Sequence, residues 1–375
     1  MIKVLIICTS LGKIKRGFEV SADQLFVEIS KEPEIETYIA QQSTTNFNKK
    51  KRITVKYIHR GSKLYNLIKK LKSENYADFV HEVSFAIMLL PWILIKQPNV
   101  VYYTEPRLGN FLFHARKKLN LKYKLFFSNG APYPPEVYKD RCDFIQQKVK
   151  WTFDIGIENG VSPQKMDIIP NGFYLKDTII LNDNEKSKLK IDLGYSDKII
   201  LLAVGAINSH HKRINYIIEE SESFLINNNA ILICIGQITN ESYEIQTAFQ
   251  HLIIKKKLII KTVTPHEVNK YYQIADLFIH ASLFEGFGRS IVEALSYGCK
   301  CILHEFVGFR EIANDTALYI TMSQKGELER AINNVLINGY QYPSIDKIKE
   351  NVVNKFDWST IRHNYIKIFQ RICQK

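Results

Sequence analysis

The clearest pattern in the chain lies at residues 277–295, which read LFIHASLFEGFGRSIVEAL. Four apolar-rich residues typical of a buried strand precede a loop with two glycines, and a helical pattern follows the loop. This order is typical of a wound α/β sheet, in which ligands bind beyond the carboxyl ends of parallel strands. Glu285 stands in the loop, and Glu293 follows about a turn and a half inside the helix. Free N–H groups at such a helix start favour a phosphate ligand.

The same alternation of short β-rich runs and helical patterns extends along the whole chain, which predicts parallel sheets covered on both faces. Because 375 residues exceed what one core usually supports, we expect two wound domains. The turn-forming Pro170-Asn171-Gly172 marks the boundary between them. The predicted strands are 3–8, 53–58, 100–103, 124–127, 155–158 and 167–169, then 199–204, 230–235, 258–261, 277–280, 301–304 and 317–320.

Composition is that of a globular protein, with 46% apolar and 24% charged residues. No secretory signal pattern precedes the first strand, and six scattered cysteines form no disulfide framework, so we expect a cytoplasmic location. The apolar run 85–95 is too short to span a bilayer and contains Pro91. It predicts a buried helix or one that also touches a membrane surface.

Net charge differs between the halves of the chain. Residues 1–175 carry 27 Lys and Arg against 16 Asp and Glu, whereas residues 176–375 carry 24 against 22. The densest basic part, 49–72, interleaves lysines with Leu64, Leu67, Ile68 and Leu71. That pattern fits a basic amphipathic helix on an anionic membrane, a nucleic-acid contact, or an ordinary solvated helix face.

Four segments resemble family 4 glycosyltransferases and follow one another along the chain in that family's order. They are, less strongly than the others, the loop from Gly12 to Gly17, then the stretch 160–172 ending in Pro-Asn-Gly, then Gly205 with Lys212, and last the E-G-F-G and I-V-E-A-L run with its two glutamates eight residues apart. The resemblance implies the GT-B fold, in which two Rossmann-like doubly wound domains face each other across a cleft. It implies an N-terminal acceptor-side domain at 1–173, a nucleotide-sugar domain at 174–357, and a helix at 358–375 that packs back on the first domain. The apolar spacing of Ile361, Tyr365, Ile368, Phe369 and Ile372 independently supports that amphipathic helix.

In that family, the residue matching Glu285 contacts the donor sugar and the one matching Glu293 accepts bonds from the ribose hydroxyls. An ionised carboxylate suits both positions because it accepts from two adjacent hydroxyls at once. Lys212 would neutralise the departing diphosphate, an interaction that grows in the transition state. The resemblance adds further donor-side residues, namely Gly205, Val263, Gly286, Phe287 and Gly288.

Two positions depart from the family pattern. Ala206 replaces a phosphate-binding arginine, so either Arg213 or Arg289 is expected to restore the charge. Asn129 stands where many members have a histidine, and we expect it to orient a sugar hydroxyl rather than act as a base. Glu105 after the strand at 100–103 and Gly17 complete the expected acceptor side.

No metal is expected in catalysis, because adjacent side chains at His210 and His211 point apart and no Asp-x-Asp follows a strand. The pair Cys299 and Cys301 lacks the second pair of ligands that a zinc site needs.

The implied activity is retaining transfer of a hexose from a nucleotide diphosphate, UDP first and GDP second, without a further cofactor. The acceptor would be a saccharide or lipid-linked glycan in cell-surface polysaccharide or glycolipid synthesis, at the inner membrane face. The same fold leaves open glycosylation of a modified nucleic-acid base, nucleotide-sugar epimerisation, and binding without catalysis.

Overall fold

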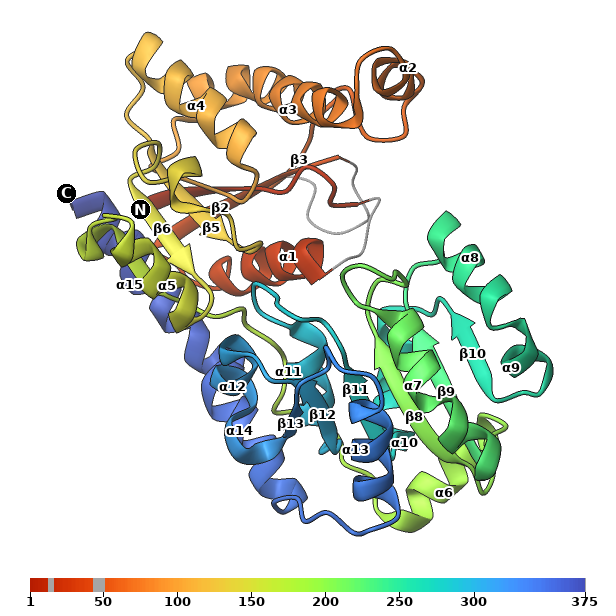
Figure 1. Cartoon of the computed structure of the whole chain (residues 1–375). Coiled ribbons are helices and arrows are strands. Elements are labelled where there is room, and N and C mark those ends of the chain that lie inside the picture. Colours follow the sequence, from red (N-terminus) through yellow and green to blue (C-terminus); the bar gives the residue numbers. More distant parts are fainter. Residues whose placement is uncertain (13–16, 43–50, 375) are drawn as a thin grey trace. The chain divides into compact units, whose positions relative to one another are not determined.

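The computed structural model describes residues 1–12, 17–42 and 51–374. These divide into two compact units, Met1–Phe173 with the segment from Trp358 onward, and Tyr174–Asp357. Each unit is a parallel α/β sheet covered by helices, so the predicted pair of Rossmann-like domains is confirmed (Figure 1).

The first unit contains a seven-stranded sheet of order β3-β2-β1-β4-β5-β6-β7, with every recorded pair parallel. Its strands are β1 (Ile2–Ile7), β2 (Ile35–Gln41), β3 (Arg52–Thr54), β4 (Val100–Tyr103), β5 (Lys124–Asn129), β6 (Phe144–Gln147) and β7 (Met166–Ile168). Its helices are α1 (Gly17–Ile29), α2 (Lys63–Leu71), α3 (Glu74–Lys96), α4 (Pro106–Lys118), α5 (Lys150–Glu158) and α15 (Trp358–Gln374).

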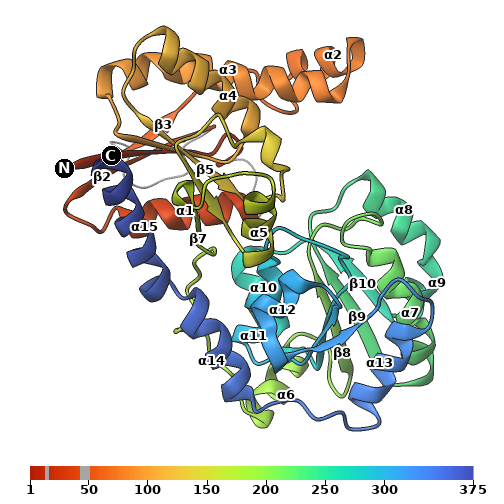
Figure 2. The ribbon, with the colours of Figure 1, turned by 60° about the vertical axis from the view of Figure 1, so that its left-hand side comes forward.

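Alternate residues of these strands point to opposite faces and build two separate cores. Leu5 and Ile7 pack with α3 and α4, whereas Val4 and Ile6 pack with α1 and α15. Helices α1 and α15 therefore cover one face, and α3 and α4 cover the other (Figures 1 and 2).

The second unit contains a six-stranded sheet of order β10-β9-β8-β11-β12-β13, again parallel throughout. Its strands are β8 (Ile199–Val204), β9 (Ala230–Ile235), β10 (Leu258–Lys261), β11 (Leu277–His280), β12 (Cys301–His304) and β13 (Leu318–Ile320). Its helices are α6 (Asp183–Asp192), α7 (Ile214–Asn227), α8 (Asn240–Ala248), α9 (Gln250–Ile254), α10 (Pro265–Ile274), α11 (Arg289–Ser296), α12 (Val307–Ala313), α13 (Glu327–Leu336) and α14 (Ile345–Phe356).

Strand order reverses direction once in each sheet, between β1 and β4 in the first and between β8 and β11 in the second. Open α/β sheets bind ligands beyond the carboxyl ends of the strands at such a switch point. The loop from Glu285 follows β11, so it lies at the switch point of the second sheet.

The prediction of a strand at 155–158 is wrong, because these residues form the last turn of α5. Ile155 and Ile157 alternate with polar or small residues as in a half-buried strand, yet both are exposed on the helix surface. The prediction also overlooked β2 and β6, and it made β3 too long. All six cysteines are free thiols, and all except Cys373 are buried.

Candidate functional site: a lysine and two glutamates at the switch point of the second sheet

Lys212 and Glu285 form an ion pair between Lys212 Nζ and Glu285 Oε1. Lys212 lies in the loop between β8 and α7, and Glu285 in the loop between β11 and α11. Because β8 and β11 are neighbours in the sheet, their carboxyl ends bring these two loops together. The ion pair brings together two residues that the sequence analysis assigned to one donor site from positions 73 residues apart.

Glu285 is 9% exposed and accepts two further hydrogen bonds. Ser282 Oγ donates to Glu285 Oε1 at 2.7 Å, and His280 Nε2 lies 2.8 Å from the same oxygen. Burial raises the pKa of Glu285, but the charges and hydrogen bonds of His280 and Lys212 outweigh it and hold the pKa well below its usual range. Glu285 is therefore ionised at neutral pH.

His280 is fully enclosed at the end of β11, and burial lowers its pKa despite the attraction of Glu285. A neutral imidazole that faces a carboxylate carries its proton on Nε2, so His280 donates to Glu285. Sequence reasoning overlooked His280 and Ser282. A polar residue at the end of an otherwise apolar strand, five positions before the predicted glutamate, was the available signal.

The loop that carries Lys212 is shaped by Gly205 and Asn208. Gly205 has φ +156°, and a Cβ there would lie 3.0 Å from Cε of Lys212, so the lysine stem passes directly over the glycine. Asn208 Oδ1 accepts from the backbone N–H groups of His211 and Lys212, at 3.2 and 2.7 Å. These contacts set the path of the lysine side chain toward Glu285.

The start of α11 is a second element of the site. Gly288 has φ +77° and forms the residue before the helix, a conformation that costs glycine least. Gly286 and Phe287 are buried beside it, and the Phe287 ring packs edge-on against Phe356. The helix start therefore has a fixed backbone that can present free N–H groups to an anion.

Glu293 lies further along α11, with a third (33%) of its side chain exposed. Tyr272 donates a hydrogen bond to Glu293 Oε2 at 3.2 Å, and Arg289 Nη2 lies 3.4 Å from Oε1. Burial raises the pKa of Glu293 above its usual value, while Arg289 and Tyr272 oppose that shift. The carboxylate is oriented by two partners and still has open surface for a ligand.

The arginines that were expected to replace the one missing at Ala206 lie in different surroundings. Arg213 Nη1 donates to the carbonyl oxygens of Met322 (2.8 Å) and Ala281 (3.3 Å), and its guanidinium stacks 4.1 Å from the Tyr216 ring centre. This places Arg213 against the second unit's own backbone. Arg289, with 14% of its side chain exposed, stands one residue after Gly288 at the helix start.

The loops after β10 and β8 carry the remaining predicted residues of this site, Val263 and the histidine pair His210 and His211. Val263 is half-buried in the loop after β10, where Thr262 Oγ1 donates to the Gly236 carbonyl. His210 and His211 are both exposed. His210 lies 3.3 Å from Glu241, and partial desolvation and the charge of Lys212 lower the pKa of His211. Among the residues that the structure describes, no cluster of three His, Cys, Asp or Glu side chains could hold a metal ion.

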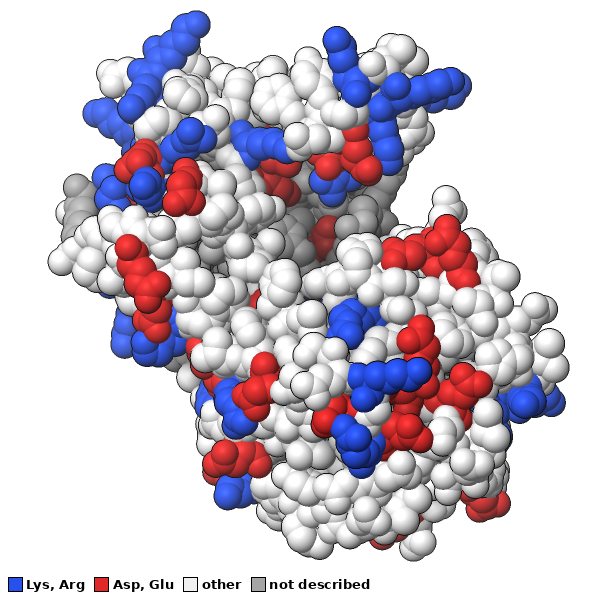
Figure 3. All heavy atoms as spheres, viewed as in Figure 1, with Lys and Arg blue, Asp and Glu red and all other residues white. Residues whose placement is uncertain are grey.

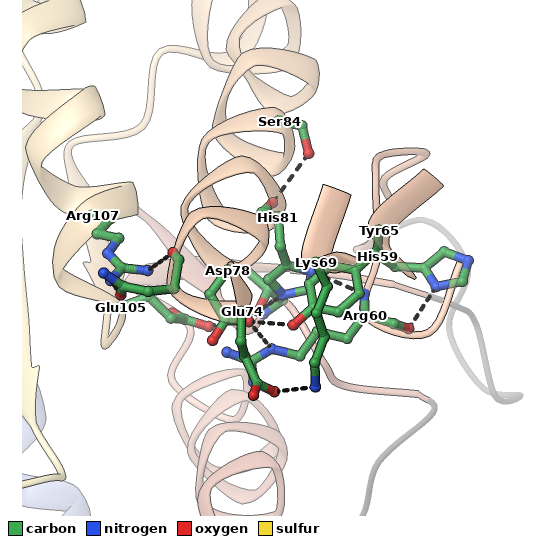
Figure 4. Close-up of polar contacts among 12 residues, drawn as sticks. His59, Arg60, Tyr65, Lys69, Glu74, Asp78, His81, Ser84, Glu105 and Arg107 are labelled. Carbon is green, nitrogen blue, oxygen red and sulfur yellow. Dashed lines mark hydrogen bonds and ion pairs between the residues drawn. The ribbon is translucent and has the colours of Figure 1, made fainter. Parts of the chain in front are cut away.

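A second polar cluster lies at the switch point of the first sheet, where β1 and β4 end (Figure 4). Glu105 Oε1 accepts from Thr9 Oγ1 at 2.8 Å, and Oε2 accepts from Thr104 Oγ1 at 2.8 Å. His81 Nδ1 accepts from the Arg60 N–H, so its Nε2 carries the proton and donates to Thr9 Oγ1 at 3.3 Å. These contacts form a chain of hydrogen bonds from His81 through Thr9 to Glu105.

The pKa values of two titratable residues in this cluster, Glu82 and His81, are shifted from their ordinary values. Burial raises the pKa of Glu82 to about 7, with the charge of Glu105 adding to the effect. Burial and the nearby Arg60 lower the pKa of His81 to about 4. Sequence analysis predicted Glu105 here but overlooked Thr9, His81 and Glu82, because the two residues of α3 lie within a mainly apolar helix.

Asn129 ends β5 and is buried, with its amide engaged on both sides. Its Nδ2 donates to Gln147 Oε1 at 3.0 Å, and its Oδ1 accepts from the Tyr133 N–H at 3.1 Å. Asn129 thus supports the loop that follows β5, and a role toward a sugar hydroxyl stays a prediction. Gly17 begins α1. Positions 13–16 of the predicted glycine loop lie outside the described residues.

Known proteins resemble this chain in sequence and in fold. Residues 184–354, which lie within the second unit, match the family described as "Glycosyl transferases group 1". The UDP-Gal:alpha-D-GlcNAc-diphosphoundecaprenol alpha-1,3-galactosyltransferase of Escherichia coli is 27% identical over 330 residues, covering 78% of this chain and 80% of that protein. The O-antigen chain mannosyltransferase RfbU of Salmonella typhimurium is 25% identical over 203 residues, covering 54% of this chain and 52% of that protein.

An uncharacterized glycosyltransferase of Methanocaldococcus jannaschii is 22% identical, and the chain spans 53% of its length. Among solved structures, Anabaena HepE in complex with UDP and glucose has a TM-score of 0.75 at 14% identity, covering 99% of this chain and 100% of that one. Sucrose-phosphate synthase from Thermosynechococcus elongatus has a TM-score of 0.79 at 15% identity, with 99% of each chain covered. The matches support a GT-B glycosyltransferase, with the group 1 match in the unit that holds Lys212, Glu285 and Glu293.

Proposed function

We propose that the chain is a retaining family 4 hexosyltransferase that takes its sugar from a nucleotide diphosphate, UDP by preference. The observation that carries this proposal is the Lys212–Glu285 ion pair at the switch point of the second sheet, with Glu293 on the following helix. At one sheet edge, the cation and the helix start suit the diphosphate of such a donor, and the two carboxylates suit the hydroxyls of its hexose and ribose.

Each residue has a distinct task in this proposal. Glu293 accepts hydrogen bonds from the ribose hydroxyls through its exposed surface. Glu285 accepts from the hexose, and His280 and Ser282 keep its carboxylate oriented. Lys212, which pairs with Glu285, neutralises the diphosphate as it leaves. The resemblance is the basis for assigning these parts of the donor to these residues.

In the proposed reaction, the bond between the sugar's anomeric carbon and the β-phosphate oxygen breaks, and its electron pair stays on the phosphate. The acceptor hydroxyl oxygen forms the new bond on the same face of the sugar, and its proton passes to the departing phosphate. Lys212 and the amide groups at the start of α11 supply positive charge to that phosphate without a metal ion.

The acceptor is proposed to be a saccharide on a lipid diphosphate, bound by the first unit. The name of the Escherichia coli relative supports this class of acceptor, since it describes a galactose transfer to a diphosphoundecaprenol-linked sugar. The polar cluster around Glu105 offers oriented carboxylate and hydroxyl groups for sugar hydroxyls. The charge excess of residues 1–175 favours a diphosphate-bearing acceptor.

The test is an incubation of the protein with labelled UDP-galactose, UDP-glucose, UDP-N-acetylglucosamine and GDP-mannose, with and without an undecaprenyl-diphosphate-linked N-acetylglucosamine. The expected result is label in the lipid phase with one donor, an α-linkage by NMR, and slow release of free sugar without acceptor. Lys212→Met serves as the inactive control. Formation of an epimer, or donor binding without any turnover, would overturn the proposal in favour of an epimerase or a binding protein.

A further inference from the structure

Helix α3 is apolar on two opposite sides. One side carries Phe85, Leu89 and Ile93, which are buried against the first sheet. Large apolar side chains that are 42–55% exposed cover the outward half of the helix, with Tyr76, Ile87 and Leu94 opposite the buried side and Phe79 and Met88 on its two flanks. A surface helix of a globular domain normally has charged residues on that side, so this exposed face needs a further explanation.

Helix α2 extends the same apolar surface. Leu64, Leu67 and Leu71 are spaced three and four residues apart, which places them on one face of the helix, and they are 49%, 51% and 70% exposed. The buried residue of α2 is Tyr65, whose hydroxyl donates to Asp78 of α3 at 2.8 Å. The helix is therefore fixed to α3 by its polar side, and its leucines point away from the core.

Lysines border this surface. Lys69 pairs with Glu74, but within the described part of the chain Lys63, Lys70 and Lys72 have no carboxylate partner. Lys117 and Lys118 end helix α4, which lies beside α3 on the same side of the sheet. In Figure 3, Lys and Arg gather over α2 and α4, and the edge of the first unit between them is largely uncharged.

We propose that the outer face of α2 and α3 is a docking surface for an anionic lipid bilayer, called here the α2–α3 face and comprising Lys63, Leu64, Leu67, Lys70, Leu71, Lys72, Tyr76, Phe79, Ile87, Met88 and Leu94. Lysine stems lie along apolar surface and place their ammonium groups at lipid phosphates, while leucine and aromatic side chains enter the headgroup and acyl boundary. A protein partner fits this face less well, because unpaired lysines are depleted from protein interfaces.

The bilayer is expected to be contacted rather than crossed. Among the described residues, α3 is the helix long and apolar enough to span a membrane by length and composition. However, Ala77, Phe85 and Leu89 of α3 belong to the buried part of the first unit, and spanning would remove them from it. Docking by the outer side leaves that packing intact. The α2–α3 face belongs to the first unit, whereas Lys212 and Glu285 belong to the second, and the proposal stands or fails independently of the transfer reaction.

The experiment is co-sedimentation of the full chain with vesicles of phosphatidylcholine containing 30% phosphatidylglycerol, and with pure phosphatidylcholine, at 50 and 300 mM salt. We expect binding to the anionic vesicles that weakens with salt. Lys63→Gln, Lys70→Gln and Lys72→Gln together should lower the partition coefficient about 100-fold, at about fivefold per lysine. Leu64→Gln with Leu67→Gln should lower it by about tenfold or more while retaining helix propensity.

A matched control lies in the second unit, where exposed Ile254 precedes Lys255 and Lys256. Ile254→Gln with Lys255→Gln and Lys256→Gln should leave vesicle binding unchanged. The melting temperatures of all variants, and their stabilisation by UDP, should match the unaltered chain, which separates lost docking from lost folding or donor binding. Three results would overturn the proposal: no vesicle binding, equal losses in the control, or retention of DNA in place of vesicles with a steep salt dependence.

Discussion

Glu285 and Glu293 are both carboxylates of the same strand-loop-helix segment, but their surroundings differ. Glu285 is buried with three polar partners on one oxygen, whereas Glu293 retains exposed surface. The first arrangement suits a fixed electrostatic role near the reacting carbon, and the second suits a ligand that enters and leaves.

The pair of substitutions Glu285→Gln and Glu293→Gln should separate these roles. Glu285→Gln should lower kcat by about 100-fold with little change in nucleotide Kd, because it removes charge at the proposed position of the reacting carbon. It should also cost about 3 kcal/mol of folding stability, since Lys212 loses its buried partner. Glu293→Gln should weaken UDP binding roughly tenfold, the loss of one charge-assisted hydrogen bond. Calorimetric titration measures the nucleotide Kd and steady-state kinetics measures kcat, with the exposed Glu350→Gln as control. Unchanged kinetics and affinity in both variants would show that the site lies elsewhere.

Glu82 gives the first unit a pH-dependent stability. Its pKa is about 7 in the folded protein against an ordinary 4.5, so between these pH values the folded state holds a proton that the unfolded state has lost. Stability therefore falls as pH rises from about 4.5 to 7, by up to about 3 kcal/mol, and stays low above pH 7.

Glu82→Gln should remove this penalty, because a neutral amide retains the acceptor for the Leu108 N–H at 3.4 Å. The melting temperature of the variant should exceed that of the unaltered chain at pH 8 and approach it at pH 4.5. The variant Glu136→Gln, at an exposed position, is the control for the loss of one negative charge. An equal or lower melting temperature at pH 8 would show that folding does not raise the pKa of Glu82.

The loop between β8 and α7 is the element that delivers Lys212. Gly205→Ala adds a Cβ at φ +156°, 3.0 Å from Cε of Lys212, and should displace the lysine. Because misplacement of a catalytic group by about 1 Å can cost 100-fold in rate, we expect a drop in kcat of roughly 10- to 100-fold.

Gly194→Ala is the matched control for this prediction. Gly194 also has a positive φ, +79°, but a Cβ there would have no neighbour within 4 Å. Both substitutions should cost about 1 kcal/mol in stability through backbone strain, and only Gly205→Ala should lower kcat. Equal kinetic losses in both variants would contradict the assigned role of the loop.

The sequence predicted elements of the second unit better than those of the first, for a physical reason. Strands β8, β9, β11 and β12 are buried on both faces and read as continuous apolar runs. In the first unit, β2 contains Glu36 and Thr37, and β6 ends in Gln146 and Gln147. Gln146 is buried because its amide donates to the Ile169 carbonyl and to the Tyr365 hydroxyl, partners that only the folded chain supplies.

The same distinction applies to the candidate site. Lys212, Glu285 and Glu293 stand in a recognisable segment order, so the sequence predicted them together. The supporting contacts of His280, Asn208 and Tyr272 come from strand ends and helix faces whose neighbours are set by strand order in the sheet. Strand order is a long-range property, and local patterns do not specify it.

At the scale of the whole molecule, the chain returns to its first unit after completing the second. Helix α15 packs through Trp358, Tyr365 and Phe369 into the core formed with α1 and β1. A Cβ at Gly172 would lie 2.4 Å from the Trp358 ring, so the chain that leaves the first unit and the chain that returns to it meet at this glycine. The two halves of the chain also differ in net charge, and the basic N-terminal half is the one proposed to bind the acceptor and the membrane.

The central claim is that the second unit binds a nucleotide diphosphate through Lys212 and Glu293. The most direct measurement is the melting temperature of the unaltered chain and of Glu293→Gln in a concentration series of UDP, GDP and ADP. A ligand that binds only the folded state stabilises it by about 2.7 kcal/mol at 100 times its Kd, which corresponds to roughly 5 °C or more for a unit of this size. We predict such a rise with UDP, logarithmic in concentration, and a smaller one for Glu293→Gln at equal concentration. An unchanged melting temperature with all three nucleotides would contradict the account.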